Sequence, residues 1–144
     1  MQIKIAIEED LAPLAELFDE YRQSLGQPRE FVKCYEFIQA RLAENDSVIL
    51  IAKQVNQLIG FIQLYPSYSS RLLMPIWFFD DIYVVEKYRK LGIATQLVQK
   101  AKELANEAKV LAVRHDNLPK ESIKALEWVG LTLLDVRDER RDSE

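Results

Sequence analysis

Hydrophobic positions along the chain repeat with two different periods, and each change of period marks an expected element. Alternating or continuous apolar runs predict strands, while apolar residues three and four positions apart predict helices. The pattern predicts one strand, two helices, three strands, a helix, a strand, a helix and a last strand. The expected ranges, in that order, are 2–7, 8–24, 28–45, 48–52, 58–65, 74–85, 92–108, 110–113, 118–129 and 131–136, with a loop over 66–73.

The most regular of these patterns follows Gly92. Apolar residues occupy positions 93, 94, 97, 98, 101, 104, 105 and 108, which lie on one face of a helix. An apolar run from Ile76 to Val85 precedes it, and the polar residues 86–90 separate the two. This stretch is therefore expected to fold as a strand, a loop and an amphipathic helix.

The loop before this helix is a candidate anion site. The first turn of a helix has backbone N–H groups without intrahelical partners, and the helix dipole adds partial positive charge there. Gly92 and Ala94 have no side chain beyond Cβ to exclude a phosphate, and Arg89 and Lys90 bring positive charge. The turn over residues 89–95 is thus predicted to bind an anion.

Length and composition describe an ordinary globular protein. The chain has 144 residues, of which 49% are apolar and 29% charged. This length fits one domain, predicted over residues 1–137, followed by a charged tail over 138–144. The net charge of −4 argues against a nucleic-acid binder and favours neutral or cationic substrates.

Single cysteine and histidine residues limit the possible chemistry. Cys34 is the only cysteine and is expected to face the core, so an intrachain disulfide is excluded. His115 is the only histidine, so a multi-histidine metal site is excluded, and no metal is expected. No stretch approaches the about 18 apolar residues that span a membrane. A cytoplasmic location without membrane or nucleic-acid partners is expected by default.

The turn also resembles a known signature. Arg89-x-x-Gly92-x-Ala94 is similar to the pyrophosphate-binding motif of the GNAT superfamily of N-acetyltransferases, and Gly130-Leu131 resembles the Gly-Phe that follows the family's fourth helix. The order of elements matches this family along almost the whole chain. The resemblance implies an α/β (α+β) GNAT fold with a mixed central sheet of about six to seven strands, four flanking helices, and acetyl-coenzyme A as co-substrate.

The resemblance also implies the cofactor contacts. In this family the strands before and after the central helix splay apart, and the pantetheine arm lies in the opening, bound to the backbone of the first strand. The pyrophosphate lies on the turn that follows. The residues expected to bind the cofactor are Ile82, Tyr83, Val84, Arg89, Lys90, Leu91, Gly92, Ile93, Ala94, Thr95 and Asn117.

Asp80 and Asp81 are the predicted catalytic residues. Paired acids at this place are similar to those of the family's polyamine acetyltransferases, where they meet a cationic acceptor. Strand alternation is expected to point one carboxylate to each face. The alternative is a pair of capping or solvent-facing acids at a bulge. Aromatic residues nearby could line an acceptor pocket or pack in the core, and these are Tyr65, Tyr68, Trp77, Phe78 and Phe79.

Three departures from the family pattern qualify the resemblance. Leu126 occupies the place of a tyrosine that commonly acts as general acid, and Lys90 and Ala94 stand where glycines are frequent. The third departure is that the chain is short for the family's closing hairpin, so a second copy could complete the sheet, or its edge could stay open.

His115 is a separate candidate, which could act as a base or be merely solvated.

Two functions follow from these residues. The first is acetyl transfer from acetyl-coenzyme A to a primary amine, with a small cationic acceptor favoured, by direct attack in a ternary complex. The alternative is a coenzyme A binding module with weak or no catalysis and a regulatory role. The two acids favour the first function, and Leu126 favours the second.

Overall fold

The computed structural model describes residues 1–70, 72–114 and 134–135, with the backbone alone described for residues 79, 80, 111–114, 134 and 135. The elements are β1 (Gln2–Ile5), the 3-10 turn η1 (Glu8–Asp10), α1 (Leu11–Ser24), α2 (Phe31–Glu44), β2 (Val48–Gln54), β3 (Gln57–Ser69), β4 (Met74–Val84), the 3-10 turn η2 (Glu86–Tyr88), α3 (Ile93–Ala108), β5 (Leu111–Arg114) and β6 (Leu134–Asp135).

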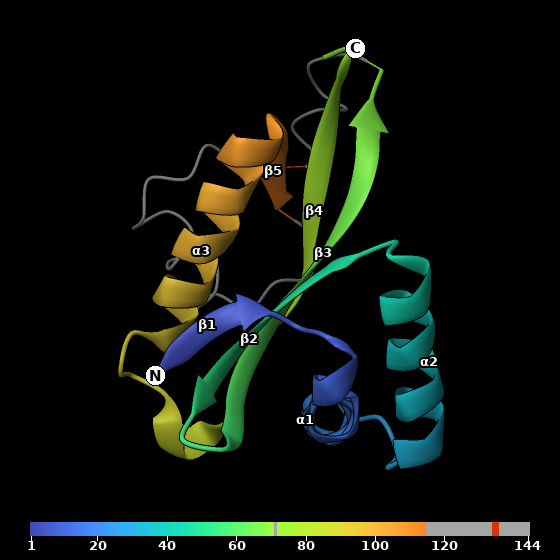
Figure 1. The fold of residues 1–144 in the computed structure, drawn as a ribbon, viewed down its shortest axis with the longest axis vertical. Helices are drawn as coiled ribbons and strands as arrows, with labels where there is room; N and C mark the ends of the chain where they lie inside the picture. The colour runs from blue at the N-terminus through green and yellow to red at the C-terminus, as the bar shows by residue number, and fades with distance from the viewer. Residues whose placement is uncertain (71, 115–133, 136–144) are drawn as a thin grey trace.

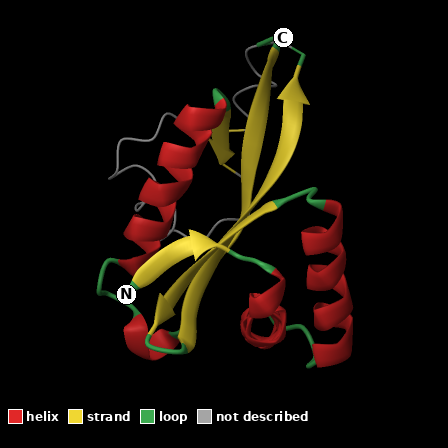
Figure 2. Cartoon of the chain, viewed as in Figure 1, coloured by secondary structure: helices red, strands yellow, loops and turns green. Residues whose placement is uncertain are grey.

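The strands form one mixed sheet in the order β1-β2-β3-β4-β5-β6. Neighbouring strands from β1 to β4 are antiparallel, whereas β5 runs parallel to β4 and β6 parallel to β5. Helix α3 covers one face of the sheet, and α1 and α2 cover the other (Figures 1 and 2). The predicted helix over 118–129 lies outside the described residues. None of the described helices is long and apolar enough to cross a membrane.

Strand β2 contributes to two hydrophobic cores because both of its faces are covered, as its continuous apolar run predicts. Leu50 and Ala52 belong to the core under α3, and Ile49 and Ile51 belong to the core under α1 and α2. The amphipathic face predicted for 92–108 is confirmed: the buried residues of α3 are Ile93, Leu97, Val98, Ala101 and Ala105.

The loop predicted over 66–73 is wrong, because β3 continues to Ser69 and pairs with β4 as far as Met74. The turn-forming composition of this stretch, which includes Pro66, suggested a loop. The pairing of β3 with β2 ends at Leu64, so Pro66 has a strand partner on one side only. A proline is tolerated there because no second ladder needs its missing N–H. The resulting β3–β4 hairpin rises beyond the helices in Figure 1.

Several element boundaries also differ from the predicted ones by one to three residues, and two examples are the end of the first strand and the start of the second helix. The first strand stops at Ile5 instead of residue 7, and Ile5 and Ile7 are about half exposed, at 50% and 48%. The second helix begins at Phe31 and not at Pro28. Where an element begins or ends is also set by tertiary contacts, and the local pattern of apolar residues does not contain those contacts.

Gly60 allows β3, β4 and α3 to approach closely. A Cβ added at Gly60 would lie 3.0 Å from the backbone oxygen of Tyr83, 3.3 Å from Val84 Cγ2 and 3.4 Å from Leu97 Cδ1. A methyl group therefore does not fit unless β4 or α3 moves.

We expect Gly60→Ala to lower the free energy of unfolding by about 1–3 kcal/mol, the usual cost of overpacking a core. Urea denaturation followed by circular dichroism measures this change. Gln57→Ala, at an exposed position on the same strand, is the control and should stay within about 0.5 kcal/mol of wild type. Equal stability of Gly60→Ala and wild type would contradict the close approach.

Candidate functional site

A bulge in β4 follows the described pairing of β4 with β5. Gln63 pairs with Asp81 and Leu64 pairs with Phe79, so Asp80 is an extra residue on β4. In the described residues, the parallel pairing of β4 with β5 covers Ile76 to Phe79, the residue before Asp80. A bulge bends its strand and increases the local twist. Within the described residues, the stretch after the bulge has β3 as a neighbour on one side and an opening on the other.

The backbone of Ile82 and Val84 faces this opening. The N–H of Val85 donates to the Ile59 carbonyl oxygen on β3 at 2.9 Å. Orientation alternates along an antiparallel ladder, so the backbone groups of Tyr83 also face β3, while those of Ile82 and Val84 face away from it. The backbone of Ile82 and Val84 is therefore turned away from β3, and binding of the cofactor by residues 82–84 stays a prediction.

Beyond β4, the chain turns into α3 through two left-handed residues. Lys90 has φ +67° and Gly92 has φ +82°. The left-handed conformation favours glycine, which explains why the family often has one at the position of Lys90. A Cβ added at Gly92 would meet nothing within 4 Å. The space beside this turn is therefore open.

The start of α3 is suited to an anion. Gly92 is the N-cap residue and supplies no side-chain hydrogen bond, and the first turn contains no acidic residue. The first N–H groups of the helix thus have no partner from a side-chain cap. Ile93 is buried in the core, so only its backbone can reach a ligand, while the Leu91 side chain is exposed.

Arg89 lies against the end of β4. Its Nε donates to the Val84 carbonyl oxygen at 2.8 Å, and its guanidinium carbon lies 5.3 Å from the centre of the Tyr83 ring. The Arg89 side chain therefore already donates to the carbonyl of Val84, one of the two residues whose backbone faces the opening. A phosphate contact of Arg89 stays a prediction.

Asp81 is held by side chains from two other elements. Its Oδ1 accepts a hydrogen bond from the Tyr21 hydroxyl of α1 at 2.9 Å. Its Oδ2 accepts one from Gln63 Nε2 at 2.8 Å and a longer one from the Tyr65 hydroxyl at 3.4 Å, both from β3. These three donors are neutral groups that orient the carboxylate. The Asp81 side chain thus lies on the α1 face of the sheet, next to the residues that face the opening.

The aromatic residues near the acids divide between the site and the core. Tyr65 contacts Asp81, as expected for a residue of the acceptor pocket. Trp77 packs against the core under α3, and Tyr68 is 82% exposed on the projecting hairpin. Tyr21 and Tyr83 lie close together, with ring centres 5.7 Å apart. The sequence analysis left Tyr65 open between an acceptor pocket and the core, and it did not single out Tyr21 or Gln63.

Several predicted residues are not located. The structure describes the backbone of Asp80 at the bulge and not its side chain, so the predicted split of the two carboxylates between the faces is not tested. Asn117, His115 and Leu126 lie outside the described residues.

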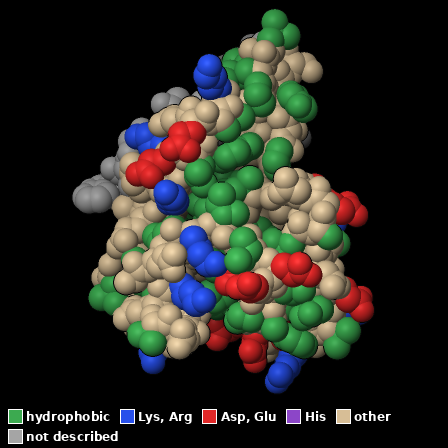
Figure 3. Space-filling view, in the orientation of Figure 1, with side chains coloured by type: hydrophobic (Ala, Val, Ile, Leu, Met, Phe, Trp, Pro, Cys, Tyr) green, Lys and Arg blue, Asp and Glu red, His purple; other side chains and the backbone are tan. Residues whose placement is uncertain are grey.

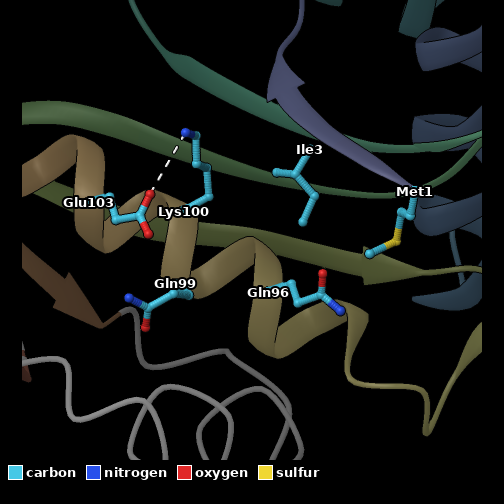
Figure 4. Close-up of a pocket in the computed structure, with 6 residues that line it drawn as sticks. All are labelled: Met1, Ile3, Gln96, Gln99, Lys100 and Glu103. Atoms are coloured by element: carbon cyan, nitrogen blue, oxygen red, sulfur yellow. Dashed lines mark ion pairs between the residues drawn. The ribbon is translucent and has the colours of Figure 1, made fainter.

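A shallow pocket between β1 and α3 is a separate feature (Figure 4). It has a volume of about 260 Å³ and is lined by Met1, Ile3, Gln96, Gln99, Lys100 and Glu103. Lys100 Nζ and Glu103 Oε2 form an ion pair of 3.7 Å beside it. None of the predicted site residues lines this pocket, so it is not the predicted cofactor site.

The surface seen in Figure 3 carries mixed charges. Hydrophobic side chains run along the projecting hairpin, and basic and acidic side chains are interspersed below it (Figure 3). This face offers no continuous basic patch of the kind that binds nucleic acid.

Comparisons with known proteins agree with this geometry. The family model described as the acetyltransferase (GNAT) family matches residues 12–122. An uncharacterized N-acetyltransferase of Bacillus subtilis is 37% identical over 119 residues, which cover 81% of this chain and 80% of the relative.

Solved structures share the fold. The crystal structure of a probable acetyltransferase is 35% identical, has a TM-score of 0.84 and is matched over 92% of this chain and 90% of the other. A predicted acetyltransferase from Clostridium acetobutylicum, solved with acetyl-CoA, has a TM-score of 0.74 over 91% of this chain and 89% of the other. At 17% identity, the latter likeness concerns the fold alone.

Titration of Tyr83 tests the position of Arg89. Burial raises the pKa of Tyr83, and the nearby Glu20 carboxylate raises it further, while the Arg89 guanidinium opposes both. Removing the cation in Arg89→Ala should therefore raise the pKa of Tyr83 still more. A ¹³C NMR titration of the tyrosine side chains measures the change.

Lys87→Ala provides the control for this titration, because Lys87 Nζ lies 5.1 Å from the centre of the Tyr88 ring. It removes a cation beside a different tyrosine and should leave Tyr83 unchanged. A Tyr83 pKa that does not move in Arg89→Ala would show that Arg89 lies elsewhere in solution.

Proposed function

Since the chain belongs to the acetyltransferase (GNAT) family, we propose that it transfers the acetyl group of acetyl-coenzyme A to the primary amine of a small cationic acceptor. The observation that carries the choice of acceptor is Asp81, a carboxylate held by Tyr21, Gln63 and Tyr65 where β4 parts from β5. The negative charge is fixed beside the segment proposed to bind the cofactor.

The residues present fit the cofactor. Two backbone positions, Ile82 and Val84, face the opening, and the uncapped start of α3 offers N–H groups to a pyrophosphate. The open space at Gly92 leaves room for phosphate oxygens. Bound acetyl-coenzyme A would supply an acetyl thioester. A similar fold solved with acetyl-CoA supports this assignment. Arg89, Lys90 and Thr95 are proposed to contact the pyrophosphate at the turn.

An amine must lose a proton before it can be acetylated, and Asp81 is proposed to accept that proton. A lysine-like amine has a pKa near 10.4, so only about one molecule in 10³ is unprotonated at neutral pH. The Asp81 carboxylate binds the ammonium form by charge and accepts its proton, which leaves a neutral nitrogen to attack the thioester carbonyl carbon. The carbon–sulfur bond then breaks, and the sulfur leaves as a thiolate, which is a tolerable leaving group. The second proton, which the nitrogen loses as it becomes an amide, passes to the thiolate or to water.

Asp80, predicted as a second catalytic acid, is part of the proposal because its backbone lies at the bulge, next to Asp81.

A small set of diamines and lysine-like amines tests the reaction. Each amine is incubated with acetyl-coenzyme A while thiol release is followed. Turnover that is faster with cationic amines than with neutral ones supports the proposal. Binding of acetyl-coenzyme A without turnover would favour the alternative, a binding module without catalysis.

Gly92→Val tests the cofactor turn. A β-branched residue resists the left-handed conformation of Gly92, so the turn should change its course and lose its alignment with the helix start. We expect acetyl-coenzyme A to bind at least about tenfold more weakly, or about 1.4 kcal/mol, in isothermal titration calorimetry.

Gly26→Val is the matched control, because Gly26 has φ +89° and an equally open Cβ position at the end of α1. It introduces the same kind of backbone strain on the other face of the sheet. Its affinity for acetyl-coenzyme A should equal that of wild type. Unchanged affinity in a folded Gly92→Val variant would remove the turn from the site.

Asp81→Asn tests the acceptor site. The substitution keeps the shape of the side chain and removes its charge, so kcat/KM for a cationic amine should fall at least about tenfold. The Kd for acetyl-coenzyme A should stay within about threefold. Glu107→Gln, which removes one charge at an exposed position of α3, should leave both constants unchanged. An Asp81→Asn variant with wild-type kinetics would make this carboxylate structural.

A further inference from the structure

Gln63 is a polar side chain in an apolar part of β3. It is 1% exposed, and its neighbours along the strand, Phe61, Ile62 and Leu64, are equally buried. Burying an amide costs free energy unless each polar atom finds a partner. An aliphatic side chain would fill this position without that requirement, so the amide indicates a specific role.

Both ends of the Gln63 amide are paired. The Nε2 group donates to Asp81 Oδ2 at 2.8 Å, and the Oε1 atom accepts a hydrogen bond from the Ser47 hydroxyl at 3.2 Å. An ionised carboxylate can only accept, so the nitrogen must face Asp81, and the oxygen must then face Ser47. The chemistry of the partners therefore sets the orientation of the amide.

The register of the sheet places Gln63 directly opposite Asp81. The two residues form a pair across β3 and β4. The next pair is Leu64 with Phe79, and the extra residue Asp80 lies between the two pairs. Gln63 thus holds the carboxylate at the very point where the bulge bends the strand. Tyr21 holds the other carboxylate oxygen from α1.

We propose that Gln63 is the positioning residue of the acceptor site: its amide, oriented by Ser47, holds the Asp81 carboxylate in place to bind the substrate ammonium and accept its proton. This inference rests on the proposed function and adds a residue that acts through Asp81 without touching the substrate. A hydrogen bond to a carboxylate favours its charged form. Loss of the amide should therefore weaken amine binding and make the carboxylate easier to protonate.

Two substitutions separate this role from simple packing. Gln63→Met keeps the length of the side chain and removes both polar atoms, and Gln63→Glu replaces the donor by a second acid. We expect kcat/KM for the amine to fall about tenfold in Gln63→Met, with the acidic limb of its pH profile moved upward by about half a unit or more. In Gln63→Glu the limb should move further, because two adjacent carboxylates resist simultaneous ionisation.

Ser47→Ala should move the acidic limb of the pH profile in the same direction by a smaller amount. The substitution removes the hydroxyl that orients the Gln63 amide, and it keeps the Gln63 Nε2 donor. Gln57→Met is the control, since Gln57 is exposed on the same strand, and its pH profile should match wild type. Thermal unfolding and the Kd for acetyl-coenzyme A establish that each variant is folded and binds the cofactor.

A folded Gln63→Met variant with the wild-type pH profile and amine KM would overturn the proposal. If wild type acetylates no amine, the proposed function fails, and the positioning role is then judged without activity. In that case a ¹³C NMR titration of the Asp81 carboxyl compares wild type with Gln63→Met. A midpoint moved upward supports the role of Gln63, and an unmoved midpoint rejects it.

Discussion

The candidate site depends on one extra residue in β4. The bulge at Asp80 directly follows Phe79, the last residue of β4 in the described pairing with β5. One extra residue exchanges the two faces of a strand, so the bulge sets the phase of the residues that follow. The Asp81 side chain then lies on the α1 face, and the backbone of Ile82 and Val84 is turned away from β3. In the proposed function, this irregularity separates the cofactor contacts from the acceptor contacts.

The two faces of the sheet supply different parts of the site. Helix α3, packed on one face, supplies a helix start at the end of β4, and its distance from the strand depends on the absence of a side chain at Gly60. Helix α1, packed on the other face, supplies Tyr21 to the carboxylate. The turn at Gly92 and the Asp81 carboxylate are therefore supported from opposite faces of the same strands.

The strand, turn and helix around Gly92 could be predicted from the sequence, and the environment of Asp81 could not. The turn at Gly92 has a local signature, since a change of hydrophobic period and a small residue are adjacent in the chain. The bond between Tyr21 and Asp81 joins residues 60 positions apart, and no local pattern contains it. Tyr21 lies in the helix expected over 8–24, where nothing local distinguishes it from its neighbours. One signal was present: Gln63 interrupts an otherwise apolar run in β3.

This division has a physical basis. Pyrophosphate and pantetheine are bound mainly through backbone groups, which depend on the course of the chain and tolerate many side chains. An acceptor amine must be distinguished by charge and shape, and that requires side chains from α1, β3 and β4 to meet at one carboxylate. Proteins with the same fold and little shared sequence can therefore bind the same cofactor. In the function proposed above, the cluster of Tyr21, Gln63 and Asp81 is the part of the chain that distinguishes the acceptor.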